Sequence, residues 1–142
     1  ACPTMIFNID TYIEKGAIGI QDIPSDDAGF IPLFFAADPR FSYAAVKGDR
    51  IVQIREKACI SPYATAGLYY FRSFRLFQDA YLETYGKSSV HEKYIAPLYQ
   101  CIIDRGERVG YLLLKPPPHI LGTPDELDAF CWQYRDDHTE RR

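Results

Sequence analysis

Residues 41–71, FSYAAVKGDRIVQIREKACISPYATAGLYYF, carry the signals that decide the predicted fold. Two runs rich in β-forming residues, 41–46 and 51–55, flank the segment Lys47–Arg50, whose Gly-Asp pair is typical of a tight turn. These runs predict a β-hairpin. A third run, residues 64–71, is dense in Tyr and Phe and predicts a further strand. We therefore expect a sheet at the centre of the fold.

The chain before the hairpin predicts two more strands. Residues 4–9, TMIFNI, form an apolar run without alternation that stops at Asp10, as in a strand buried on both faces. A polar loop over residues 19–29 then leads to a strand over residues 30–36. Because the sequence enters a buried strand almost at once and has no initiator Met, we expect it to be cut from a longer chain.

The chain after the hairpin is more helical. Ser73 is a suitable N-cap for a helix that ends at Gly86, a typical C-terminal stop. The predicted apolar face of this helix consists of Phe74, Phe77, Tyr81 and Tyr85. Apolar residues at helical spacing predict a second helix over residues 95–103, with Gly106 as its stop.

One more strand and one more helix complete the prediction. Residues 109–114 predict a strand, and Thr123, Pro124 and Glu126 are typical of a capped helix start with a capping box. The apolar face of this last helix is predicted to be Leu127, Phe130, Cys131 and Tyr134. We expect residues 1–135 to form one α/β domain, a mixed sheet covered by helices, and the polar tail 136–142 to fray.

Composition excludes several classes of function. The chain has 142 residues and a formal charge of −3, which fits one domain and argues against nucleic-acid binding. Its four cysteines are far apart and form no zinc-binding motif, so we interpret them as reduced thiols of a cytoplasmic protein. No apolar run is long enough to cross a membrane. The sequence has no P-loop or G-x-G-x-x-G motif, and its three histidines form no recognisable triad.

Two positions could carry chemistry by their place in the predicted sheet. Asp10 follows a strand, where ligands gather in open α/β sheets, and its carboxylate could bind Mg²⁺ or merely cap a turn. Glu56 and Lys57 follow the hairpin. Lysine can hold a phosphate and glutamate can accept hydrogen bonds from hydroxyls, but this pair could equally form an exposed ion pair.

Five segments in order resemble sugar-1-phosphate nucleotidyltransferases, the sugar-nucleotide pyrophosphorylases. They are IFNID (6–10), RIVQIREK (50–57), ATAGLYYF (64–71), EKYIAP (92–97) and LGTPDEL (121–127). Each motif is weak alone, and their shared order and spacing carry the resemblance. It covers residues 4 to about 130 and implies a partial Rossmann-like (GT-A-type) domain. The covered part is the C-terminal, sugar-binding portion, without the N-terminal nucleotide-binding part.

The resemblance also implies roles for individual residues. Asp10 would bind Mg²⁺ and Asn8 would shape the turn beside it, while Glu56 would bind sugar hydroxyls and Lys57 the sugar phosphate. Gly67 would let the sugar approach the backbone. The implied reaction joins a nucleoside triphosphate and a sugar 1-phosphate into an NDP-sugar for polysaccharide or other sugar-nucleotide biosynthesis, with release of pyrophosphate.

Two departures from the family pattern leave alternatives open. A second metal-binding Asp is often found where this chain has Ile120, and the E-K-P motif reads Glu56-Lys57-Ala58. The chain could therefore be part of an enzyme, a non-catalytic binding or regulatory relative, or a domain with no retained site. A homo-oligomer or a missing N-terminal segment could complete it. We expect the isolated chain to form no nucleotide sugar.

Overall fold

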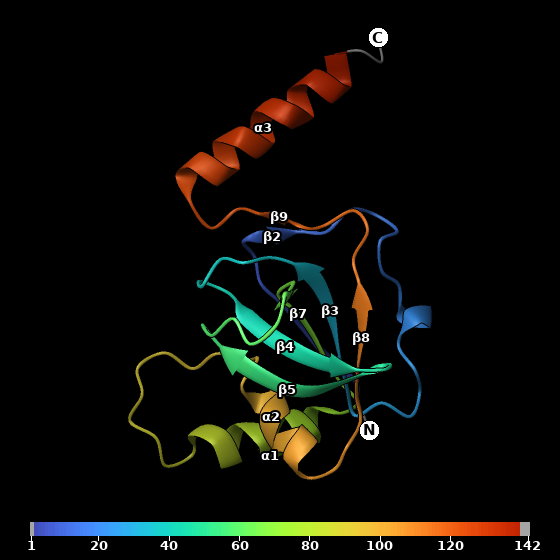
Figure 1. The fold of residues 1–142 in the computed structure, drawn as a ribbon, viewed down its shortest axis with the longest axis vertical. Coiled ribbons are helices and arrows are strands. Elements are labelled where there is room, and N and C mark those ends of the chain that lie inside the picture. The colour runs from blue at the N-terminus through green and yellow to red at the C-terminus, as the bar shows by residue number, and fades with distance from the viewer. Residues whose placement is uncertain (1, 140–142) are drawn as a thin grey trace.

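A computed structural model describes residues 2–139, and in this range the main sheet has seven strands in the order β1-β7-β3-β6-β4-β5-β8 (Figure 1). The strands are β1 (Thr4–Phe7), β3 (Gly29–Phe35), β4 (Ser42–Lys47), β5 (Arg50–Glu56), β6 (Tyr63–Thr65), β7 (Leu68–Phe71) and β8 (Val109–Leu113). Strands β3 and β8 are parallel, whereas the other neighbours are antiparallel. The predicted mixed α/β class is therefore confirmed.

The sheet closes on itself in its central part. Strand β8 pairs with β3 on one side and with β5 on the other, so that β3, β6, β4, β5 and β8 form a ring of pairings. Strands β7 and β1 extend the sheet beyond β3. The strands from residues 41–71 therefore lie at the centre of the fold, as their sequence predicts.

The predicted hairpin is confirmed, but the predicted strand over residues 64–71 is two strands. Gly48 makes the hairpin turn with a φ of +62°. Gly67 has a φ of +76°, a left-handed conformation outside the regular β region, and it separates β6 from β7. Strand β6 pairs with β3 and β4, whereas β7 pairs with β1 and β3. Both halves thus pair with β3, and the break gives each a different second neighbour, β4 for β6 and β1 for β7.

Strand β1 is an edge strand, and the prediction that it is buried on both faces was wrong. Among the described residues it pairs only with β7. Ile6 packs against the core, while Met5 and Phe7 on the opposite face are 50% and 47% exposed. Residues 5–7 of β1 are all apolar, so the sequence contains no alternation to reveal the exposed face.

Helices α1 (Phe74–Tyr85) and α2 (Leu98–Asp104) pack together against the sheet (Figure 1). The Ser73 side chain caps α1, as predicted, by accepting a hydrogen bond from the Leu76 backbone N–H. Phe74, which we expected on the apolar face, is half exposed because the helix turns Leu76 and Ala80 inward instead.

Two predicted helix ends differ in detail. Gly86 ends α1 in a right-handed conformation rather than the left-handed one typical of a C-terminal glycine; a Cβ there would overlap the Leu82 carbonyl oxygen. Helix α2 begins after Pro97, later than the predicted residue 95. Gly106 follows α2 with a φ of +80° and is the expected stop.

Helix α3 (Pro124–Thr139) extends away from the body of the molecule (Figure 1). The predicted capping box is confirmed: the Thr123 backbone N–H donates to Glu126, and the Glu126 backbone N–H donates to the Thr123 hydroxyl. No Gly or Pro follows Pro124, so the helix continues through residues 136–139, which we expected to fray; residues 140–142 of that tail lie outside the described part.

Two short strands, β2 (Thr11–Tyr12) and β9 (His119–Ile120), form a small second sheet that holds the start of α3. Phe130 and Tyr134 pack against the Tyr12 ring, and His119 packs against Phe130. Leu127 and Cys131, which we also placed on the apolar face of α3, are exposed. The loop over residues 19–29 contains one short 3₁₀ turn, η1 (Ile20–Asp22).

All four cysteines are free thiols, and Cys2, Cys59 and Cys131 are exposed. Among residues 2–139, no helix has the length and apolar character needed to cross a membrane.

Candidate functional site

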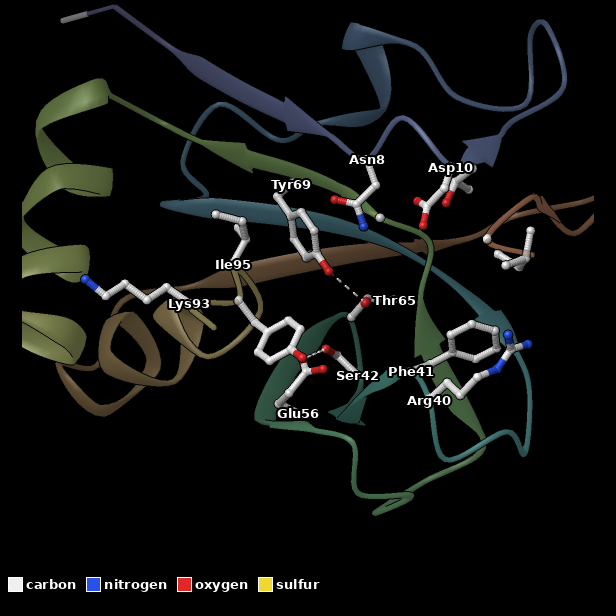
Figure 2. A pocket seen from close by; sticks show the side chains of 15 residues that line it. Asn8, Asp10, Arg40, Phe41, Ser42, Glu56, Thr65, Tyr69, Lys93 and Ile95 are labelled. Atoms are coloured by element: carbon white, nitrogen blue, oxygen red, sulfur yellow. Dashed lines mark hydrogen bonds between the residues drawn. The ribbon is translucent and has the colours of Figure 1, made fainter. Parts of the chain in front are cut away.

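A cavity of about 420 Å³ opens where several strand ends meet. Four of the five residues implied by the resemblance line it: Asn8, Asp10, Glu56 and Gly67. Asn8 and Asp10 follow β1, Glu56 ends β5, and Gly67 is the break between β6 and β7. Figure 2 shows Asn8 and Asp10 on one side of the cavity and Glu56 on the other. Segments far apart in the sequence therefore form a single pocket.

The register between β1 and β7 brings Asn8 to Gly67. Phe7 pairs with Leu68, and the next backbone N–H, that of Asn8, donates to the Gly67 carbonyl oxygen at 2.8 Å. A Cβ at residue 67 would lie only 3.0–3.2 Å from atoms of the Asn8 side chain. The positive φ and this close approach both require glycine, so the cavity wall here is bare backbone.

Asp10 lies on the same side of the cavity as Asn8 (Figure 2), and it is held beside the end of β9. Its backbone carbonyl accepts a hydrogen bond from the Leu121 N–H at 2.7 Å, and its carboxylate faces Gly122. Ile120 also lines the cavity and supplies no metal-binding atom. Within residues 2–139, no group of three or more His, Cys, Asp or Glu side chains is placed to hold a metal. Of the two positions that the family pattern associates with a metal ion, Asp10 and Ile120, only Asp10 carries a carboxylate.

Glu56 is the partly buried carboxylate of the cavity. The Ser42 hydroxyl donates to its Oε2 atom (Figure 2). Burial raises the pKa of the Glu56 carboxyl, an effect that the Ser42 hydrogen bond and the charge of Lys57 oppose. Among the described residues, no basic side chain forms an ion pair with Glu56. The Glu56 carboxylate can therefore accept further hydrogen bonds from a ligand in the cavity.

Lys57 does not line the cavity. It adopts a left-handed backbone conformation, with a φ of +51°, and its side chain is 53% exposed. Its Nζ atom donates to the Tyr94 hydroxyl at 2.5 Å and lies 3.7 Å from Glu92. The hydrogen bond to Tyr94 is the main cause that raises the pKa of Lys57. Because Tyr94 lines the cavity, Lys57 lies at its rim, one side chain away.

Several further polar residues lie at the cavity: Thr65 is inside the 64–71 motif but was given no role, and Ser42 and Arg40 lie outside the motifs. Ser42 and Thr65 are buried, and the Thr65 hydroxyl is 3.0 Å from the Tyr69 hydroxyl. The available signal for Thr65 was a polar residue within the apolar and aromatic run 64–71. Arg40 also lines the cavity, and its guanidinium lies 2.8 Å from Asp38 and 2.8 Å from Glu126 at the start of α3.

Comparison with solved structures identifies the fold. A nucleoside-diphosphate-sugar pyrophosphorylase from Vibrio cholerae RC9 superposes with a TM-score of 0.78 and 27% identity, over 90% of this chain and 55% of that chain. No protein-family model matches the sequence, and no curated protein matches it.

Two more distant structures share the fold. One is described as a glucose-1-phosphate thymidylyltransferase from Bacillus anthracis in complex with sucrose (TM-score 0.72, 20% identity, 89% of this chain and 52% of that chain). The other is the inositol-1-phosphate CTP transferase from T. maritima (TM-score 0.68, 16% identity, 92% of this chain and 54% of that chain).

The chain thus has the α/β fold of nucleotidyltransferases, and the resemblance inferred from its motifs is confirmed by its structural neighbours. It spans about half the length of each of these three proteins.

Proposed function

We propose that this chain is the sugar-phosphate-binding portion of a nucleotidyltransferase that forms NDP-sugars from a nucleoside triphosphate and a sugar 1-phosphate. The observation that carries the proposal is that Asn8, Asp10, Glu56 and Gly67 line one cavity. The similarity to a nucleoside-diphosphate-sugar pyrophosphorylase supports it. We further propose a cytoplasmic location, for which the four unpaired cysteines are the support, and a role in polysaccharide or sugar-nucleotide biosynthesis.

Each cavity residue has a chemical task in this proposal. The bare backbone at Gly67 lets a sugar ring lie against the wall beside Asn8, whose amide can donate to and accept from hydroxyls. Glu56 accepts hydrogen bonds from the sugar. Lys57 binds the phosphate as a point charge after its Nζ atom leaves Tyr94 and Glu92 at the rim.

Asp10 is the residue that would hold Mg²⁺. Mg²⁺ commonly uses one or two carboxylates together with substrate phosphates and water, so a single aspartate at the cavity is compatible with it. A bound Mg²⁺ would offset negative charge on the reacting phosphates. With Ile120 at the second position, the phosphates and water would have to supply the other ligands.

Transfer itself requires the attacking sugar phosphate to lie in line with the α-phosphorus of the nucleotide, with no covalent enzyme intermediate. These 142 residues contain no glycine-rich loop to bind a triphosphate. We therefore expect the purified chain, with nucleoside triphosphate, Mg²⁺ and glucose 1-phosphate, to release no pyrophosphate above the blank. Release above the blank would contradict this expectation.

Isothermal titration calorimetry with glucose 1-phosphate tests the binding role. Removing a cation from a phosphate typically costs about 1.5–3 kcal/mol, so Lys57→Ala should weaken binding by roughly tenfold or more. Lys47→Ala, at the other end of the same hairpin and outside the cavity, is the matched control and should bind like the wild type. No binding by the wild type, or equal affinities of the two variants, would contradict the proposal.

A non-catalytic binding or regulatory protein is the second candidate function. The observation that favours it is the apolar Ile120 at the cavity, where the family pattern often has a metal ligand. Binding of glucose 1-phosphate that is unchanged by Mg²⁺ would favour this candidate, because a catalytic site should bind the phosphate and the metal cooperatively.

A further inference from the structure

The acidic and basic side chains at the cavity differ in how far they are already paired. Among the described residues, neither Asp10 nor Glu56 forms an ion pair. The cations are engaged: Arg40 is paired with Asp38 and Glu126, and Lys57 with Glu92. The uncompensated charge facing the cavity is therefore negative.

Lys93 does not change this balance. It is among the residues at the cavity, but its Nζ atom lies 5.5 Å from the centre of the Tyr81 ring on α1. Figure 2 shows its side chain directed away from Glu56. Its charge thus contacts an aromatic face outside the pocket, a common arrangement for an exposed lysine.

The surroundings of Glu56 fit a cation better than a neutral group. Ser42 occupies only Oε2, so Oε1 remains open to a ligand. Phe41, Tyr69 and Tyr94 also line the cavity, and aromatic faces attract cations. Arg40 already lies 5.6 Å from the centre of the Phe41 ring and Lys57 4.7 Å from that of Tyr94, so the Tyr69 ring is the one of the three without such a cation contact among the described residues. A hydroxyl would satisfy hydrogen bonds of Glu56 but leave its charge partly buried and unpaired. A protonated amine would satisfy the hydrogen bonds and neutralise the charge.

We propose that the phosphorylated ligand of this cavity carries a protonated amine, which binds Glu56 between the aromatic side chains. The inference rests on the proposed function, in which the cavity binds a sugar phosphate, and narrows it to an amino sugar phosphate. A phosphorylated amino alcohol has the same ammonium and phosphate chemistry without the sugar ring. Lys57 is the cation nearest in sequence, and Glu92 compensates its charge at the rim.

The test compares ligands that differ by one group. Calorimetry at pH 7 should give at least tenfold tighter binding of glucosamine 1-phosphate than of glucose 1-phosphate, because they differ only in an ammonium group and a hydroxyl. Phosphoethanolamine is the third probe and represents the amino alcohols. Glu56→Gln should reduce the preference for the amine to less than threefold. Glu107→Gln, a carboxylate outside the cavity, should keep it.

The outcomes separate this inference from the proposed function. Equal binding of the two sugar phosphates, or an unchanged preference in Glu56→Gln, contradicts the inference that the ligand carries an amine. Either result leaves the proposed binding of a sugar phosphate intact. Binding of phosphoethanolamine alone supports an amine-bearing ligand and contradicts the proposal that the ligand is a sugar phosphate. Absence of binding by all three probes overturns both. The circular dichroism spectrum of Glu56→Gln should match that of the wild type. If the variant does not fold, the comparison of glucosamine 1-phosphate with glucose 1-phosphate on the wild type decides the inference by itself.

Discussion

Asp27 and Glu56 are both carboxylates in the interior, yet their surroundings differ. Asp27, just before β3, is fully buried, and its Oδ1 accepts from the Arg108 Nε at 2.6 Å. Arg108 also lies 2.6 Å from Asp49 in the hairpin turn. Among the described residues, the Asp27 Oδ2 has no partner, and a side chain at Gly110 would overlap it. Glu56 has only a serine as partner and faces a cavity.

The difference teaches how to separate structural from functional acids in this fold. The Asp27–Arg108 pair ties the start of β3 to the start of β8 and to the hairpin turn, and the Asp27 carboxylate packs closely against Gly110. Glu56 is left unpaired where there is room. Burial raises the pKa of both carboxyls, so the pKa does not distinguish them; the partner and the adjacent space do.

The largest expected effect comes from breaking the structural pair. Arg108→Leu leaves the buried Asp27 carboxylate unpaired and should lower the free energy of unfolding by about 2–3 kcal/mol, less than for a fully buried pair because the arginine is 41% exposed. Urea denaturation measures it. Ser42→Ala, which removes the partner of Glu56, should cost only about 1 kcal/mol, since that carboxylate still faces the cavity. Similar losses in both variants would contradict the distinction.

A smaller effect is expected at the glycine of the cavity wall. Gly67→Ala should destabilise the protein by about 1–2 kcal/mol, because the left-handed backbone is strained and the methyl group presses on Asn8. Gly48→Ala is the matched control: its φ is also positive, but a Cβ there meets nothing, so about 1 kcal/mol is expected. Thermal unfolding compares them. In calorimetry only Gly67→Ala should weaken the binding of glucose 1-phosphate. Equal weakening by Gly48→Ala would contradict the proposal that the sugar lies against the backbone at Gly67.

The smallest effect is a pH dependence of stability. Burial, the main cause, raises the pKa of Asp27 above its ordinary value of 3.8 in the folded protein. The folded state therefore holds this proton more tightly than the unfolded state. Its contribution is fully present below pH 3.8 and is lost as pH rises through the higher folded pKa. Relative to Asp27→Asn, the wild type should lose stability over that window in urea titrations; a relative gain would contradict the direction.

Local structure could be predicted wherever neighbouring residues decide it. The Gly48 turn, the Ser73 cap and the Thr123–Glu126 capping box depend on contacts within a few residues, and all three are confirmed. The exposed face of β1 and the break at Gly67 could not be predicted, because they depend on which strands lie alongside.

For the site, the sequence alone supplied the candidates Asn8, Asp10, Glu56, Lys57 and Gly67 through the order of its motifs. Tertiary structure decided that four of them share a cavity while Lys57 turns to Tyr94 at the rim. It also decided that Asp27, which no motif marks, is the buried acid of the core. The physical reason is that a motif specifies residue types along the chain, whereas burial, ion pairing and open space arise from strands distant in sequence.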